Sequence, residues 1–272
     1  MKYVMEFGIE VFGFIAAVFI GFFLGLLGGG GSVLAVPVLV YLFHIKVAPA
    51  ITFSLLIVGL ASAFGSIHYF KEKLIDPKKA LYFGLPSILT VSLTRWFIVP
   101  NLPESITITN SFALSQRQYL LLIFAILMML SAIKMIRKSA TSTHQNSSPE
   151  FPLLALYGVG VGFITGFIGV GGGFLIVPAL YAFGKMTMKE AIGTSLVVIA
   201  LNSLIGFSTS IVQDSQNDGI SIGLIFSILA FSALGVLIGN LISKRIQSEK
   251  LKPLFGWFIL LMGAFILGKE FL

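Results

Sequence analysis

Long apolar runs with almost no charge dominate this sequence. Several reach about 18 residues or more, enough to cross a bilayer core of about 30 Å as an α-helix. Only 11% of the 272 residues are charged, whereas soluble domains carry roughly 25%, so the chain cannot cover a water-facing surface. The sequence therefore predicts an all-α integral membrane protein. The apolar segments fall at about 9–27, 32–43, 48–70, 80–99, 118–136, 152–169, 172–184, 190–212, 219–242 and 253–270.

Two of these segments, 32–43 and 172–184, are too short to span the bilayer. As helices they reach only about 18–20 Å. Each begins at a glycine cluster, and Ser32 directly follows the first cluster. The clusters are Gly28-Gly29-Gly30-Gly31 and Gly169-Val170-Gly171-Gly172-Gly173.

An ungapped internal repeat relates the two clusters. Shifting residues 21–65 by 141 positions gives 17 identities in 45 positions, including Pro37 matched to Pro178. Apolar composition alone does not pair a glycine cluster and a proline at constant spacing, so we infer a duplication. The predicted organisation is a first membrane repeat at 1–138, a polar linker at 139–150 and a second membrane repeat at 151–272.

Basic residues indicate which loops face the cytoplasm. The basic loops are 71–79, 134–138 and 244–252, and the loops without lysine or arginine are 100–116 and 213–219. Counting the crossings between these loops makes 152–184 a helical hairpin that begins and ends on one side. Each half is then a glycine-rich hairpin plus three transmembrane helices, and the second half is inverted relative to the first. The linker is predicted to be cytoplasmic and both termini periplasmic.

The glycine clusters are the first candidate binding site. Glycine lets a ligand approach the backbone, and the helix that follows offers unpaired N–H groups at its positive end, with Ser32 placed to cap the first such helix. We predict that two tips from opposite faces bind one anion. The alternative is that the glycines only permit tight turns and close helix packing. The candidates are Gly28, Gly29, Gly30, Gly31, Ser32, Gly169, Gly171, Gly172 and Gly173.

Polar residues inside the segment 190–212 extend this candidate site. Asn202 follows Thr194 by eight residues and Ser195 by seven, so all three are expected near one helix face. There they can donate hydrogen bonds to oxyanion oxygens. Ser54, the repeat counterpart of Ser195, is a further candidate. The alternative is that these side chains only join helices together.

Arg95 stands in the fourth apolar segment. An ionisable residue within a membrane is by default a functional candidate, and arginine suits an oxyanion, so Arg95 is a candidate for anion binding or gating. Snorkelling to the outer interface beside Trp96 is the alternative that the sequence slightly favours.

The motifs GLLGGGGSVLAVP (25–37), GFIGVGGGFLIVP (166–178) and GTSLVVIALNSLIGF (193–207) resemble the TauE/SafE family of sulfite and organosulfonate permeases. The resemblance runs from about residue 10 to 268. It implies a bacterial inner-membrane carrier for sulfite or related sulfur anions. The halves differ at key positions, since Thr52-Phe53-Ser54 matches Gly193-Thr194-Ser195 and Ala61 matches Asn202, so the site is expected to be asymmetric.

Function is therefore expected to be transport, with export favoured because the inside-negative potential drives anions outward. Alternatives are an importer, a carrier of another anion, or a non-transporting assembly or scaffold protein. No HExxH motif, cysteine or metal-ligand spacing occurs, so we expect no enzyme activity, cofactor or metal. The expected partners are a small inorganic or organic anion and membrane lipid, and nucleic acid is not expected. The sequence leaves open whether the protein is a monomer or a homodimer.

Overall fold

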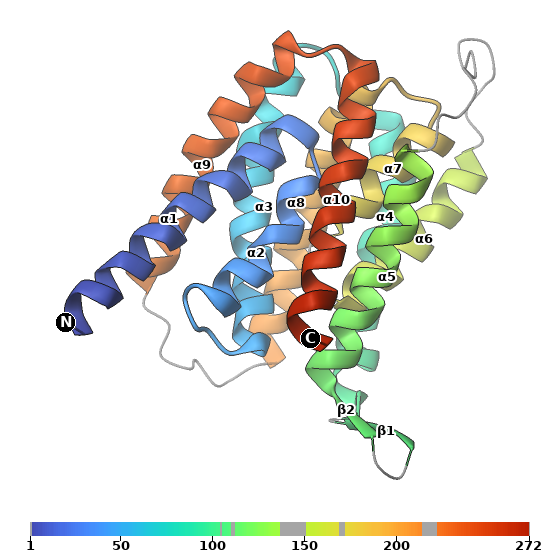
Figure 1. Ribbon diagram of the computed structural model, residues 1–272. Helices are drawn as coiled ribbons and strands as arrows, with labels where there is room; N and C mark the ends of the chain where they lie inside the picture. The colour runs from blue at the N-terminus through green and yellow to red at the C-terminus, as the bar shows by residue number, and fades with distance from the viewer. Residues whose placement is uncertain are drawn as a thin grey trace.

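The structure is a computed structural model that describes residues 2–103, 105–109, 112–136, 151–168, 172–213 and 222–271. The predicted linker 139–150 lies outside these ranges. The described chain is a bundle of α-helices (Figure 1). The helices are α1 Lys2–Leu27, α2 Gly30–Tyr41, α3 Val47–Lys71, α4 Pro77–Leu93, α5 Gln116–Ile136, α6 Phe151–Ile168, α7 Gly173–Phe183, α8 Met188–Gln213, α9 Ile222–Arg245 and α10 Ser248–Phe271.

Each apolar segment predicted from the sequence is a helix, so the prediction of an all-α membrane protein is confirmed for the bundle. The predicted outer loop 100–116 contains two β-strands that the sequence analysis did not predict. A π-helical turn η1 (Thr94–Ile98) and a 3-10 turn η2 (Val99–Asn101) extend α4, and an antiparallel hairpin follows, with β1 at Ser105–Thr109 and β2 at Phe112–Ser115. The alternating Ile and Thr of β1 favour a strand because β-branched side chains pack well on a pleated surface.

Four stretches in α3, α4 with η1, α8 and α9 are long and apolar enough to cross a membrane. They are Pro49–Lys71, Pro77–Ile98, Met188–Ile211 and Gly223–Arg245. The helices α5 and α10, also predicted to cross, carry shorter apolar stretches at Leu121–Ile133 and Pro253–Lys269. The chain is thus a multi-pass membrane protein, and the count of six full crossings stays a prediction.

The two sequence halves interleave in the bundle (Figure 1). Helices α3 and α8 pack against each other, α1 packs along α9, α6 along α4, and α5 along α10. When the halves are exchanged, so that α1 replaces α6 and α4 replaces α9, these four pairings map onto one another. The sequence repeat is therefore matched by helix contacts between the two halves that are equivalent under this exchange.

The basic turns gather at one end of the bundle. The α3–α4 turn and the α9–α10 turn lie at the upper end in Figure 1, and the β-hairpin and both termini lie at the lower end. At the upper end the Lys244 ammonium lies 2.8 Å from the Glu72 carboxylate and joins the ends of α9 and α3. Hydrogen bonding to Lys244 lowers the pKa of Glu72, so on acidification this exposed ion pair is lost as the pH falls through that lowered pKa.

Candidate functional site

The two hairpin turns meet inside the bundle. Gly28 and Gly172 have positive φ angles of 73° and 65°, which suit glycine, and α2 and α7 begin immediately after these turns. A Cβ built on Gly29 would overlap the carbonyl group of Gly173, and a Cβ on Gly173 would overlap Gly29. The tips therefore touch backbone to backbone, which only glycine permits. Gly169 and Gly171 lie outside the described residues.

This contact brings two helix N-termini together. The N-caps of α2 and α7 are Gly29 and Gly172, and the first N–H groups of each helix have no partner within the helix. Both ends carry partial positive charge, so their approach favours a negative group nearby. Ser32 is not the predicted cap, because it is the third residue of α2 and its hydroxyl donates to the Gly29 carbonyl at 2.7 Å.

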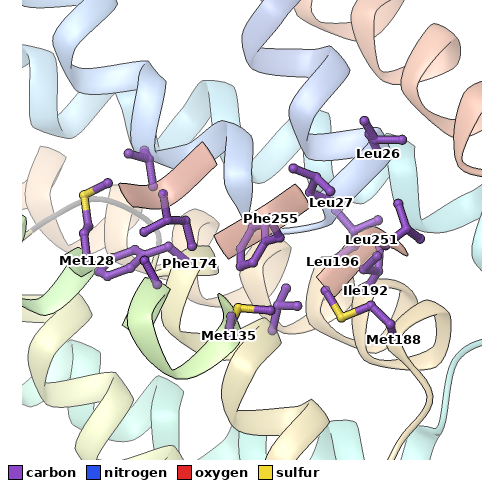
Figure 2. Close-up of a cluster of buried hydrophobic side chains, with 14 of the residues drawn as sticks. Leu26, Leu27, Met128, Met135, Phe174, Met188, Ile192, Leu196, Leu251 and Phe255 are labelled. Atoms are coloured by element: carbon purple, nitrogen blue, oxygen red, sulfur yellow. The ribbon is translucent and has the colours of Figure 1, made fainter. Parts of the chain in front are cut away.

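The side of the tips that faces α5 and α10 is apolar. A Cβ on Gly30 would lie 3.1 Å from the Phe255 ring of α10, and Gly31 packs against the backbone of α1 at Ile20. Figure 2 shows Phe255 beside Leu27 within the cluster of buried hydrophobic side chains that covers this side. Gly30 and Gly31 thus serve close packing here, and their predicted contact with substrate stays a prediction.

The polar residues of α8 point in two directions. Ser195 lies at the first tip, since its Oγ would be 2.9 Å from a Cβ on Gly28, and its hydroxyl donates to the Ile192 carbonyl. Ser54 makes the equivalent bond to the Ile51 carbonyl in α3.

Thr194 and Asn202 instead face α4 and the turn before it. The Asp76 N–H donates to the Thr194 hydroxyl at 3.1 Å, and the Asn202 amide donates to the Ser87 hydroxyl at 2.7 Å. The structure therefore brings only Ser195 of the three to the glycine tips. Thr194 and Asn202 join α8 to neighbouring segments.

Arg95 is buried, and the interpretation that it snorkels to the interface is wrong. Its side chain is 5% exposed, whereas that of Trp96 beside it is 49% exposed. The guanidinium donates to the Ser210 hydroxyl of α8, and its Nε has no partner. No carboxylate of the described chain forms an ion pair with it. Arg95 stands in the π-helical turn η1, a distortion frequent at functional sites.

Buried polar atoms without a partner mark further positions. An unsatisfied buried group costs roughly 1–3 kcal/mol and calls for an explanation such as a bound ion or water. The sequence analysis identified Arg95 and Asn202 as candidates, but not Ser62, Ser203 or Asn240. The signals that could have found them are the repeat identity of Ser62 with Ser203 and a lone asparagine in an apolar helix. In the described residues these atoms are Ser62 Oγ, Arg95 Nε, Asn202 Oδ1, Ser203 Oγ and Asn240 Oδ1.

The candidate groups contact helix α8 at two levels along its length. Ser195 and Ile199 lie at the glycine tips, and Gly206 lies beside Arg95, 3.7 Å from its Nε when a Cβ is added. The seven residues from Ile199 to Gly206 span about 10 Å of helix. The candidate site thus has one level where the two helix N-termini meet and, about 10 Å further along α8, a second level that holds the buried Arg95 guanidinium.

Comparisons with known proteins agree with a transport role. The family model described as sulfite exporter TauE/SafE matches residues 13–266. A probable membrane transporter protein of Xylella fastidiosa is 29% identical over 92% of both chains. Another from Methanocaldococcus jannaschii is 26% identical over 92% of this chain and 94% of its own length. No solved structure matches the chain significantly.

Proposed function

Since this chain belongs to the sulfite exporter TauE/SafE family of membrane transporters, we propose that it is a secondary carrier for small sulfur oxyanions such as sulfite or organosulfonates. We further propose that it works in a bacterial inner membrane and moves the anion outward. The glycine tips, Ser195 and Arg95 would contact the anion along its route.

Arg95 is the observation that carries this proposal. Desolvating an ion is expensive, and buried arginines are normally paired with acidic groups. Within the described chain Arg95 has one hydroxyl partner and an unused Nε donor. A guanidinium matches the geometry of an oxyanion, so an anion from outside the protein would complete this site. The two converging helix N-termini favour the same charge.

The direction of transport follows from charge. An inside-negative potential contributes about 2.3 kcal/mol per charge per 100 mV toward anion exit. Uptake would need a coupled cation and a group to bind it, and no Asp or Glu is found among the buried residues that the structure describes. Export is therefore the favoured direction.

Alternating access would use the proposed inversion of the two halves. Arg95 is buried at 5% exposure, so an anion reaches it only when the packing between the halves opens. The equivalent helix pairings between the two halves support two related packings, one open to each side.

Labelling of single cysteines tests the proposed orientation, because the natural chain is free of cysteine. Lys73 lies in the α3–α4 turn and Asn101 in η2, and both are exposed. We expect Lys73→Cys to react with an impermeant thiol reagent only from the cytoplasmic side, and Asn101→Cys only from outside. Reaction of both from one side would contradict the crossing count.

A panel of anions in liposomes tests the proposed substrate class. Purified protein is reconstituted into liposomes loaded with sulfite, sulfoacetate, phosphate or chloride, and efflux is followed at a fixed membrane potential. We expect sulfite or sulfoacetate to leave faster than phosphate and chloride, and faster than from protein-free liposomes. Equal leakage of all four would support the scaffold alternative, and preference for phosphate or chloride would overturn the proposed substrate.

A further inference from the structure

Asn240 is a buried amide in α9 that the function described so far does not use. It is 5% exposed. Its Nδ2 makes one long contact of 3.5 Å with the Gly65 carbonyl, and its Oδ1 has no partner. An amide with a spare acceptor inside an apolar helix is costly, so its position needs a reason.

The packing of α9 shows that Asn240 occupies the place that Arg95 holds in the other half. Repeat-related glycines of α1 and α6 pack against backbone carbonyls of α9 and α4, and these carbonyls come in pairs 145 residues apart. Arg95 and Asn240 are also 145 residues apart and continue the series by one helical turn. In the first pair, the Ser87 carbonyl lies against Gly162 and the Ser232 carbonyl lies against Gly21. In the second pair, the Val91 carbonyl lies against Gly166 and the Val236 carbonyl lies against Gly25.

The helices that face these two residues correspond as well. Arg95 lies against Gly206 and Ser210 of α8, and Asn240 lies against Gly65 of α3. Gly206 and Gly65 are repeat counterparts, and Ser210 corresponds to Tyr69, one turn beyond Gly65. The hydroxyl of Tyr69 donates to the Gly25 carbonyl at 2.9 Å and lies 3.0 Å from that of Ser243.

We propose that Asn240, with the hydroxyls of Tyr69 and Ser243, forms a second, uncharged binding station for the transported oxyanion. This station lies toward the α9–α10 end of the bundle, where the α3–α4 and α9–α10 turns are. This inference rests on the proposed function. The Asn240 Nδ2 donates a hydrogen bond to an anion oxygen, and its Oδ1 accepts a hydrogen bond from the O–H group of a protonated oxyanion. The Tyr69 hydroxyl already donates to the Gly25 carbonyl, so the Ser243 hydroxyl donates to the Tyr69 oxygen. Ser243 supplies a further donor when its hydroxyl turns from Tyr69 to the anion.

The difference in charge between the stations gives the second one a role. An anion held by neutral hydrogen bonds is bound more weakly than one held by a guanidinium. In the proposed orientation Asn240 lies toward the cytoplasm and Arg95 toward the outside. The uncharged station therefore receives the anion from the cytoplasm and passes it on to the cation.

Variants of Asn240, studied in oriented vesicles with zero-trans sulfite flux, test this station. Asn240→Asp keeps the shape of the side chain but repels an anion, and Asn240→Ser keeps a smaller neutral donor. We expect Asn240→Asp to raise the KM for sulfite offered at the α9–α10 end by about tenfold or more, with a smaller change at the opposite end. Asn240→Ser should raise it several-fold.

The control is Ser227→Ala, which removes an exposed α9 hydroxyl bonded to the Gly223 carbonyl and should leave both KM values unchanged. An unchanged KM at the α9–α10 end, with or without a loss of maximal rate, would overturn the station. If Asn240→Asp does not yield monodisperse protein, the KM of Asn240→Ser decides in the same way. A wild-type protein that carries no anion overturns the proposed function itself, which separates the two failures.

Discussion

Replacing Arg95 with glutamine should lower sulfite flux by about tenfold or more without unfolding the protein. Hydrogen bonds to charged groups contribute about 1.5–3 kcal/mol, and each 1.4 kcal/mol is a factor of ten in affinity or rate. The variant keeps an amide that can bond to Ser210, but it removes a buried charge that has no ion-pair partner in the described chain. Thermal stability should therefore stay equal or rise, because the desolvation penalty of the cation is relieved.

The matched control for this variant is Arg245→Gln, since Arg245 is an exposed arginine at the end of α9. Flux and Tm of the control should stay within experimental error of the wild type. Arg95→Lys, which keeps the charge but loses the planar fork, should fall between glutamine and arginine. Full flux in Arg95→Gln would show that the buried cation has no part in transport, and a large loss of Tm would indicate a structural role instead.

Adding one methyl group at Gly29 should destabilise the whole bundle. A Cβ there would overlap the Gly173 carbonyl, and backbone atoms of two packed helices cannot move aside as a flexible side chain can. Overpacking of this kind costs typically 1–3 kcal/mol, occasionally more. We expect Gly29→Ala to lower the Tm of the purified protein by several degrees and to reduce its yield from membranes.

Gly160→Ala is the control for this steric effect. Gly160 lies in α6, and an added Cβ would meet nothing within 4 Å. Alanine is favoured over glycine in a helix by about 0.8–1.0 kcal/mol, so this variant should be as stable as the wild type or slightly more. Equal Tm values for Gly29→Ala and Gly160→Ala would show that the tips do not touch in the protein as it exists in the membrane.

Helix positions were predictable from the sequence because lipid allows little else. A backbone in the bilayer core must satisfy its own hydrogen bonds, so each long apolar run had to become a helix. The hairpin Ser105–Ser115 escaped prediction because it lies in a segment without that constraint. The alternation of its isoleucines and threonines was a local signal that an analysis of apolar length does not use.

The candidate site was only partly predictable. The internal repeat identified the glycine clusters, since two backbones in contact leave no room for a side chain at either position. The direction of Arg95 was missed because depth along a helix does not fix which way a side chain points. The π-helical turn at Thr94–Ile98 alters the rotation of that segment, and the hydroxyl of Ser210, 115 residues away, completes the contact.

The potential dependence of sulfite efflux tests the central proposal most directly. Liposomes containing the protein are loaded with sulfite and potassium, and valinomycin sets an inside-negative potential of known size. A carrier that moves net negative charge should release sulfite faster as the interior becomes more negative, and Arg95→Gln should remove most of that flux. Efflux equal to that of protein-free liposomes at every potential would contradict the proposal that this chain carries sulfur anions.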